Sequence, residues 1–255
     1  MTVRRPDLWS AWFRSFAVQG SWNYRTLLGS GVAYALLPVL RRVYAGDPVG
    51  MRRALEDHLQ AFNAHPYLAS LAVGALARAE SDGEDRERIR RFRRALSGPL
   101  GSLGDRAVWF RWRPFCVLSA LAAWLGAGIS PWAAILLFLG LYNAGHVALR
   151  AWAFRAGWSE GLQVARVLGE WPADRWSRML TPVNAVLLGG VGYGAARRVL
   201  ADGEAALGAA AGGWGAAVGV AAGAALAFRW PAAGRRAAPF LLAAGALAGW
   251  LLGGG

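Results

Sequence analysis

The sequence has little of what most enzymes use. Its 255 residues include one cysteine and three histidines. A disulfide within the chain is excluded because Cys116 has no second cysteine to pair with, and the compartment stays open. None of His58, His65 and His146 has an acidic residue nearby in a catalytic pattern, and there is no nucleophile or metal-ligand constellation. We therefore expect no catalytic residue, no metal and no cofactor, which also argues against a lipid-modifying enzyme.

Charge is absent from one long stretch, residues 114–149. A transmembrane helix needs roughly 20 mostly apolar residues, so this run is long enough for two. Gly126 and Pro131 interrupt it. We predict a helical hairpin with a short first arm, 114–126, and a full second arm, 131–149. A buried helical pair in a soluble protein is the alternative, but a further apolar segment at 181–196 favours the membrane.

Acidic residues are scarce beside basic ones, 15 against 28, which gives a net charge of +13 carried by arginine. Such a balance suits nucleic acid or an anionic membrane face. No nucleic-acid motif is present, and the sequence has fourteen tryptophans, a residue that favours membrane interfaces. Because arginine accumulates on cytoplasmic segments, residues 1–113 and 150–178 are predicted to be cytoplasmic, with the hairpin tip near Ser130 outside.

The first helices are predicted from spacing and caps. Residues 1–16 place aromatic side chains on one face, which fits an interfacial amphipathic helix or, equally, a helix packed on its own domain. Residues 26–44 form an apolar helix that Pro38 should kink or end. Asp47 and Pro48 are a capping residue followed by proline, so an amphipathic helix is predicted over 48–64.

The next segments alternate between apolar and charged. Residues 63–67 form a polar corner because Pro66 disfavours helical geometry at the residue before it. Residues 67–77 are a core helix or a re-entrant arm, too short to span a membrane. Residues 84–94 are densely charged and predict a water-exposed helix. Residues 98–105 form a glycine-rich loop that lacks the ending of a phosphate-binding loop.

The expected fold class is an all-α, polytopic membrane protein. Amphipathic and re-entrant helices occupy the N-terminal half and a transmembrane helix bundle occupies the C-terminal half. Two regions follow, a cytoplasmic or interfacial region with broken helices over 1–113 and a transmembrane helical region over 114–255. The last apolar runs, 205–228 and 239–255, are rich in alanine and glycine, which allows close helix packing.

Three ordered motifs carry a family resemblance. They are Ser21-Trp22-Asn23-Tyr24 followed by Gly31 and Ala35-Leu36-Leu37-Pro38; the run from His58 to Tyr67; and Gly98-Pro99-Leu100 through Gly104-Asp105 to Arg113-Pro114. Weaker matches are Asn143, Gly157-Trp158 and Gly161. Over residues 16–198 the chain resembles the IID membrane subunit of the mannose/fructose/sorbose class of sugar phosphotransferase systems (PTS).

The resemblance implies a multi-pass protein of the bacterial cytoplasmic membrane and a non-catalytic transport subunit. It also implies a hetero-oligomer with a IIC membrane subunit, and this complex would be in contact with membrane lipid. IIA and IIB phosphocarrier subunits would supply the phosphate, and a hexose-type sugar would be phosphorylated by phospho-IIB during uptake. The alternative is a regulatory or scaffold membrane protein that kept the fold and lost transport.

Five residues are predicted to bind the sugar: Trp22, Asn23, Asn63, His65 and Asp105. Each lies at a break, where exposed backbone groups are stable at membrane depth only around a polar cavity. One ring, two amides, one imidazole and one carboxylate suit a neutral polyol. Trp22 and Asn23 have a plainer interpretation as an interface anchor and a helix cap.

Overall fold

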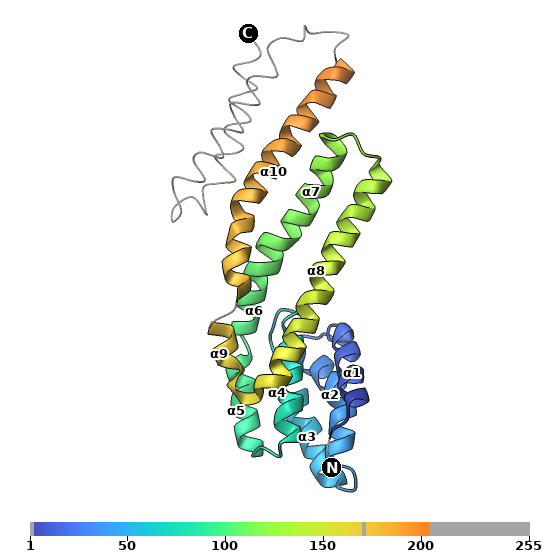
Figure 1. The fold of residues 1–255 in the computed structure, drawn as a ribbon. Coiled ribbons are helices and arrows are strands. Elements are labelled where there is room, and N and C mark those ends of the chain that lie inside the picture. Colours follow the sequence, from blue (N-terminus) through green and yellow to red (C-terminus); the bar gives the residue numbers. More distant parts are fainter. Residues whose placement is uncertain (1–2, 170–171, 204–255) are drawn as a thin grey trace. The chain divides into compact units, whose positions relative to one another are not determined.

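The computed structural model describes residues 3–169 and 172–203, and every regular element among them is a helix (Figure 1). The apolar runs predicted at 205–228 and 239–255 lie outside the described residues. The chain divides into two compact units. Unit 1 comprises Met1–Trp109 and Ala144–Asp174, and unit 2 comprises Phe110–Asn143 and Arg175–Gly255.

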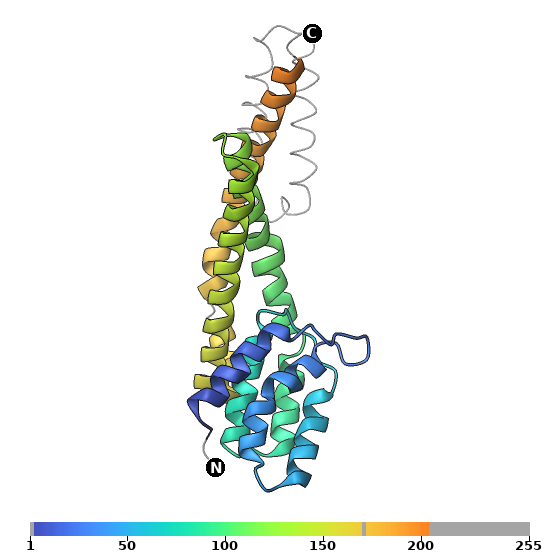
Figure 2. The same cartoon turned by 90° about the vertical axis from the view of Figure 1, so that its right-hand side faces the viewer.

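Unit 1 is a helical body (Figure 2). At its centre is α4, Ala69–Ser81, in which Ala69 to Ala77 are all buried. The helices are α1 (Arg5–Arg14), η1 (Ser15–Ala17), α2 (Gly29–Val43), α3 (Pro48–Leu59), α5 (Arg86–Leu96), α6 (Pro99–Gly104), η3 (Gly161–Gln163) and α9 (Val164–Gly169). A helix apolar on all sides is a core helix, which confirms that alternative for residues 67–77.

The glycines at the centre of unit 1 allow α4 to touch α8 (Pro131–Glu160). A Cβ added at Gly157 would lie 2.1 Å from the carbonyl oxygen of Leu71, and one at Gly74 would lie 2.2 Å from that of Phe154. The two backbones are therefore in contact, which larger residues would prevent. The part of α8 beyond the predicted end at residue 149 is thereby packed in unit 1.

Helix boundaries in the first half follow the predicted caps in part. Helix α3 begins at Pro48, and the Asp47 carboxylate accepts a hydrogen bond of 2.8 Å from the Gly50 backbone N–H, as predicted, but the helix ends at Leu59 and not at residue 64. Helix α2 continues through Pro38, so the proline does not end it. Residues 98–105, predicted as a loop, are mostly helix: Gly98 adopts φ of +96°, and Pro99 then begins α6.

Helices α1 and α5 each have a buried face and an exposed face. Helix α1 buries Ala11 in the core of unit 1, while Trp9 and Phe13 are 60% and 63% exposed, so both alternatives for residues 1–16 describe part of it. Helix α5 buries Ile89, Arg93 and Leu96, and its other side chains are exposed or half-exposed, so the predicted water-exposed helix also has a packed face. Arg93 donates to the carbonyl oxygens of His58, Gln60 and Ala61 at the end of α3, and a basic side chain there satisfies carbonyls that the helix leaves unbonded.

A partly buried cluster of ionisable side chains joins α3, α4 and α5 to the end of α2, and we call it the ionic cluster: Tyr44, Asp57, His58, Glu80 and Arg86. The Glu80 carboxylate accepts from His58 at 2.7 Å, from Arg86 at 2.6 Å and from Tyr44 at 2.7 Å. Burial alone would raise the pKa of Glu80, but the bonds from His58 and Arg86 outweigh it and lower the pKa. Glu80 is therefore ionised and paired inside the core.

Unit 2 contains α7 (Arg113–Leu125), the first part of α8, and α10 (Pro172–Gly203). The turn at 126–130 separates α7 from α8, which confirms the predicted helical hairpin. Arg198 donates to the Trp124 carbonyl at 2.8 Å, so α10 lies against α7. Two segments, Pro131–Gly169 and Arg178–Arg198, are long and apolar enough to cross a membrane.

Candidate functional site

Broken segments of unit 1 that are distant in sequence are joined by backbone hydrogen bonds. Phe62 N–H donates to Thr26 at 3.1 Å, and Leu28 N–H donates to Phe62 at 3.0 Å. The next residue, Asn63, donates to the Ser97 hydroxyl at 3.0 Å and accepts from Gly98 N–H at 3.0 Å. The loop before α2, the corner after α3 and the start of α6 therefore lie side by side.

The loop before α2 is organised by Asn23. Its side-chain oxygen accepts from the backbone N–H groups of Arg25 and Thr26 at 3.0 and 2.9 Å, and its amide nitrogen donates to Thr26 Oγ1 at 2.8 Å. The turn holds Leu27 at φ of +52°, which is uncommon for a residue with a side chain. Trp22, 47% exposed, packs 4.9 Å from the ring of Tyr24. Both predicted residues thus contact their own loop.

The corner after α3 places Asn63 outside and His65 inside. Asn63 is exposed, whereas His65 is only 1% exposed. His65 Nδ1 accepts from the backbone N–H of Tyr67 at 3.2 Å. Burial, followed by the nearby positive charge of Arg150, lowers the pKa of His65 to about 4. The imidazole is therefore neutral near pH 7, with its proton on Nε2.

A π-helix, η2 (Asp105–Trp112), follows α6 directly. It begins at the half-buried Asp105, and the preceding Gly104 lies against His65: a Cβ there would meet the Cβ of His65 at 2.2 Å. π-Helical turns are rare and often occur at functional sites. This segment brings the neighbourhood of Asp105 to the imidazole of His65.

An aromatic cluster surrounds the same histidine, and we define it as Phe16, His65, Tyr67, Trp109 and His146. The rings of Tyr67 and Trp109 lie 4.9 and 5.1 Å from that of His65, and Tyr67 stacks on His146 at 4.2 Å. Trp109 is not among the five residues predicted to bind the sugar. The one feature of the sequence that points to it is its position within the third motif, between Asp105 and Pro114.

Arg150 is buried at the base of the aromatic cluster. Its guanidinium donates to the Ser15 carbonyl at 2.6 Å and to His146 Nε2 at 2.7 Å, and lies over the rings of Phe16 and Tyr67. These partners are neutral, so the charge is held by dipoles and ring faces. His146 and Arg150 lie one turn apart on α8. The contacts of Arg150 with Ser15 and Ser70, which are 135 and 80 positions away in the sequence, could not be predicted from the sequence.

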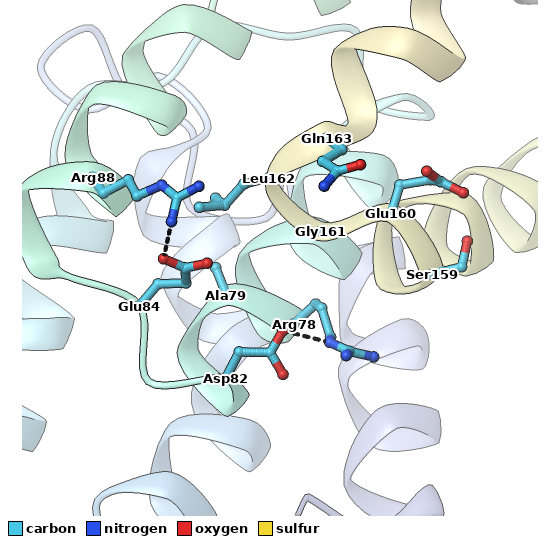
Figure 3. A pocket seen from close by; sticks show the side chains of 10 residues that line it. All are labelled: Arg78, Ala79, Asp82, Glu84, Arg88, Ser159, Glu160, Gly161, Leu162 and Gln163. Carbon is cyan, nitrogen blue, oxygen red and sulfur yellow. Dashed lines mark hydrogen bonds and ion pairs between the residues drawn. The ribbon is translucent and has the colours of Figure 1, made fainter.

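A pocket of about 260 Å³ lies elsewhere in unit 1, between the end of α4, the start of α5 and η3 (Figure 3). Arg78 pairs with Asp82 at 2.7 Å, and Arg88 pairs with Glu84 at 2.6 Å. None of the five predicted residues lines this pocket. Its two arginines are paired with acidic neighbours along the chain, so we place the candidate site at the broken segments instead.

The sequence of the chain is similar to that of a known protein family. The family model described as "PTS system mannose/fructose/sorbose family IID component" matches residues 2–193. The chain belongs to this family. It is 31% identical over 173 residues to the mannose-specific EIID component of Escherichia coli (strain K12), covering 66% of this chain and 60% of that protein. With the fructose permease IID component of Bacillus subtilis (strain 168), identity is 30% over 65% of this chain and 61% of that one.

The fold of the IID family is found in a solved structure as well. The mannose transporter ManYZ, determined by cryo-electron microscopy in complex with microcin E492, matches with a TM-score of 0.58 and 25% identity, over 75% of this chain and 71% of that chain. The mainly helical fold class is thereby confirmed. The chain spans about 60% of the length of the curated relatives that it matches.

Proposed function

We propose that this IID-family chain is the membrane subunit of a PTS transporter of the mannose/fructose/sorbose class. It acts with a IIC subunit to move a hexose-type sugar, which a phospho-IIB partner phosphorylates during uptake, with IIA upstream. The observation that carries the proposal is the family match over residues 2–193, joined to a fold shared with ManYZ. The chain itself performs no catalysis and acts within a hetero-oligomer.

The proposed location is the bacterial cytoplasmic membrane, crossed more than once. Support comes from the two apolar segments, Pro131–Gly169 and Arg178–Arg198, and from exposed side chains such as Trp132 and Leu136 on α8, 74% and 68% exposed. We propose the two regions given by the sequence, a cytoplasmic or interfacial region over 1–113 and a transmembrane region over 114–255. Labelling Ser130→Cys and Arg91→Cys in a Cys116→Ser background, with a reagent that does not cross the membrane, tests the orientation. Labelling of Arg91→Cys from outside would contradict it.

The proposed sugar site comprises Trp22, Asn23, Asn63, His65 and Asp105. The hydrogen bonds between residues 26 and 62 and between 63 and 98 support it, because they hold the breaks together. Asn23 orders the loop that carries Trp22, whose ring would stack on the sugar, while Asn63 and Asp105 would bond hydroxyl groups. His65 would act as a neutral donor.

Reconstitution tests the function. The chain is expressed with the IIC, IIB and IIA proteins encoded beside it, in cells that lack other hexose uptake, and accumulation of ¹⁴C-labelled mannose, fructose and sorbose is measured. We expect sugar phosphate to accumulate only when all four proteins are present. Equal uptake without this chain would contradict the proposal. Sugar binding without uptake would instead favour the regulatory or scaffold alternative.

A further inference from the structure

His65 carries a buried donor whose partner is missing among the described residues. Because Nδ1 accepts from Tyr67 N–H, the neutral ring has its hydrogen on Nε2, and that atom is buried without a hydrogen-bond partner. Leaving a buried donor unsatisfied costs roughly 1–3 kcal/mol. Native proteins rarely leave such a group without a purpose. A ligand hydroxyl would satisfy it.

The surroundings of the imidazole show from which side a ligand would arrive. Gly104 closes one side, since even a Cβ at that position would lie 2.5 Å from His65 Cγ. Tyr67 is only 8% exposed. Trp109, whose ring lies 5.1 Å from the imidazole, is 38% exposed and is the more open of the two rings. A ligand that approaches His65 from outside therefore meets Trp109 first.

The π-helix gives the Trp109 ring its position. In a helix bonded from residue i to i+5, residues four and five apart share one side. Asp105 and Trp109 therefore lie on the same side of η2, and Trp109 contacts His65 from it. The indole of Trp109 thus meets the imidazole of His65 from a segment 44 residues further along the chain, on the side of η2 that also carries Asp105.

We infer that Trp109 is a further sugar-binding residue, whose ring packs on a C–H face of the sugar while His65 Nε2–H donates to one of its hydroxyls. The ring moves from its present place beside the imidazole when the sugar enters. A neutral imidazole suits an uncharged sugar, and an aromatic ring supplies the flat apolar face. This inference rests on the proposed function and extends its site to a residue outside the five.

The test uses the complex of this chain with its IIC partner, purified in detergent, and equilibrium binding of ¹⁴C-labelled mannose, fructose and sorbose. Trp109→Ala is expected to weaken binding of the bound sugar tenfold or more. Trp109→Phe, which keeps a flat ring, should stay within threefold of the unmodified complex. Phe110→Ala is the matched control because Phe110 is the next residue of the same π-helix and is 74% exposed; it should stay within twofold.

Two outcomes would overturn the inference in distinguishable ways. If the unmodified complex binds none of the three sugars and supports no uptake, the proposed function fails and this inference fails with it. If the unmodified complex binds sugar and Trp109→Ala binds it equally well, only the role of Trp109 fails. Should Trp109→Ala not assemble with IIC, Trp109→Leu replaces it, because leucine fills space without a flat face; binding equal to Trp109→Phe would then overturn the inference.

Discussion

Unit 1 contains two partly buried clusters, the ionic cluster with Arg86 and the aromatic cluster against which Arg150 packs, and they differ in what surrounds the arginine charge. In the ionic cluster, Arg86 pairs with the carboxylates of Glu80 and Asp57 at 2.6 and 2.5 Å. In the aromatic cluster, Arg150 is held by a carbonyl, a hydroxyl, an imidazole and two ring faces. Each histidine leaves one nitrogen unpartnered, Nδ1 of His58 and Nε2 of His65.

The unpartnered atoms have different surroundings. His58 is 0% exposed and is bound to Glu80, itself 1% exposed, so its free nitrogen lies in a closed core. His65 lies next to the half-exposed Trp109 and beside a π-helix. We interpret the ionic cluster as a junction that holds helices together and the aromatic cluster as the place prepared for a ligand. Four predictions test this distinction.

The largest effect is expected from Glu80→Gln. It leaves Arg86 and His58 without their shared buried carboxylate, and breaking such a pair costs about 3 kcal/mol or more. The midpoint of thermal unfolding in detergent measures the loss. Glu56→Gln is the control, because the exposed pair of Glu56 with Arg52 contributes less than ~0.5 kcal/mol. Equal midpoints for the two variants would remove the structural role of the ionic cluster.

Acid should destabilise the protein through His65. The folded-state pKa of about 4 lies below the ordinary 6.5, so between pH 6.5 and 4 the unfolded chain binds a proton that the folded chain does not. The contribution of His65 to the free energy of unfolding is fully present above pH 6.5. It falls as the pH decreases, by at most about 3 kcal/mol at pH 4. His65→Gln should reduce this slope, while His58, whose pKa burial also lowers, still contributes. An unchanged slope in His65→Gln would contradict the assignment.

Arg150→Met should destabilise the protein less than Glu80→Gln does. It removes the donor of His146 Nε2, whereas the Ser15 carbonyl keeps its bond from Val18 N–H and the Ser70 hydroxyl keeps its bond with the Ser15 hydroxyl. No buried carboxylate loses its partner, and one unsatisfied neutral group costs about 1–3 kcal/mol. Thermal unfolding measures it under the same conditions, with Arg150→Lys as the variant that keeps the charge and loses the planar fork. A loss as large as that of Glu80→Gln would erase the difference between the clusters.

The smallest effects concern the site alone. Asp105→Asn and Asn63→Ala are each expected to weaken sugar binding or uptake tenfold or more, about 1.4 kcal/mol, without loss of the folded complex. Equilibrium binding of labelled sugar to the IIC complex measures both. Unchanged affinity in both variants would exclude these residues from the site and favour a regulatory role.

Features set by neighbouring residues could be predicted from the sequence. The start of α3 at Pro48 depends on Asp47 immediately before it, and the hairpin depends on an uncharged run with a glycine–proline break. Both involve only local chain geometry and the affinity of apolar residues for lipid. The residues named for the site stand at such local breaks, which is why the corner at 63–67 was found.

Features that depend on distant contacts were missed. Helix α2 tolerates Pro38, with Leu36 and Val39 fully buried in the core on either side of it. Arg150 looked like the start of an interface segment, yet it is 2% exposed because Ser15 and Ser70 bind it from other helices. Trp109 gains its importance from its contact with His65, and the position of Trp109 between two parts of the third motif does not by itself predict that contact.

The central claim is that the broken segments around His65 form the sugar site. A cryo-electron microscopy structure of this chain with the proposed IIC partner, determined without sugar and with mannose, fructose or sorbose, tests the claim most directly. The account predicts a sugar hydroxyl within about 2.7–3.2 Å of His65 Nε2, and a displaced Trp109 ring packed on the sugar. A sugar bound elsewhere, with the Trp109 ring still beside the imidazole in both structures, would contradict it.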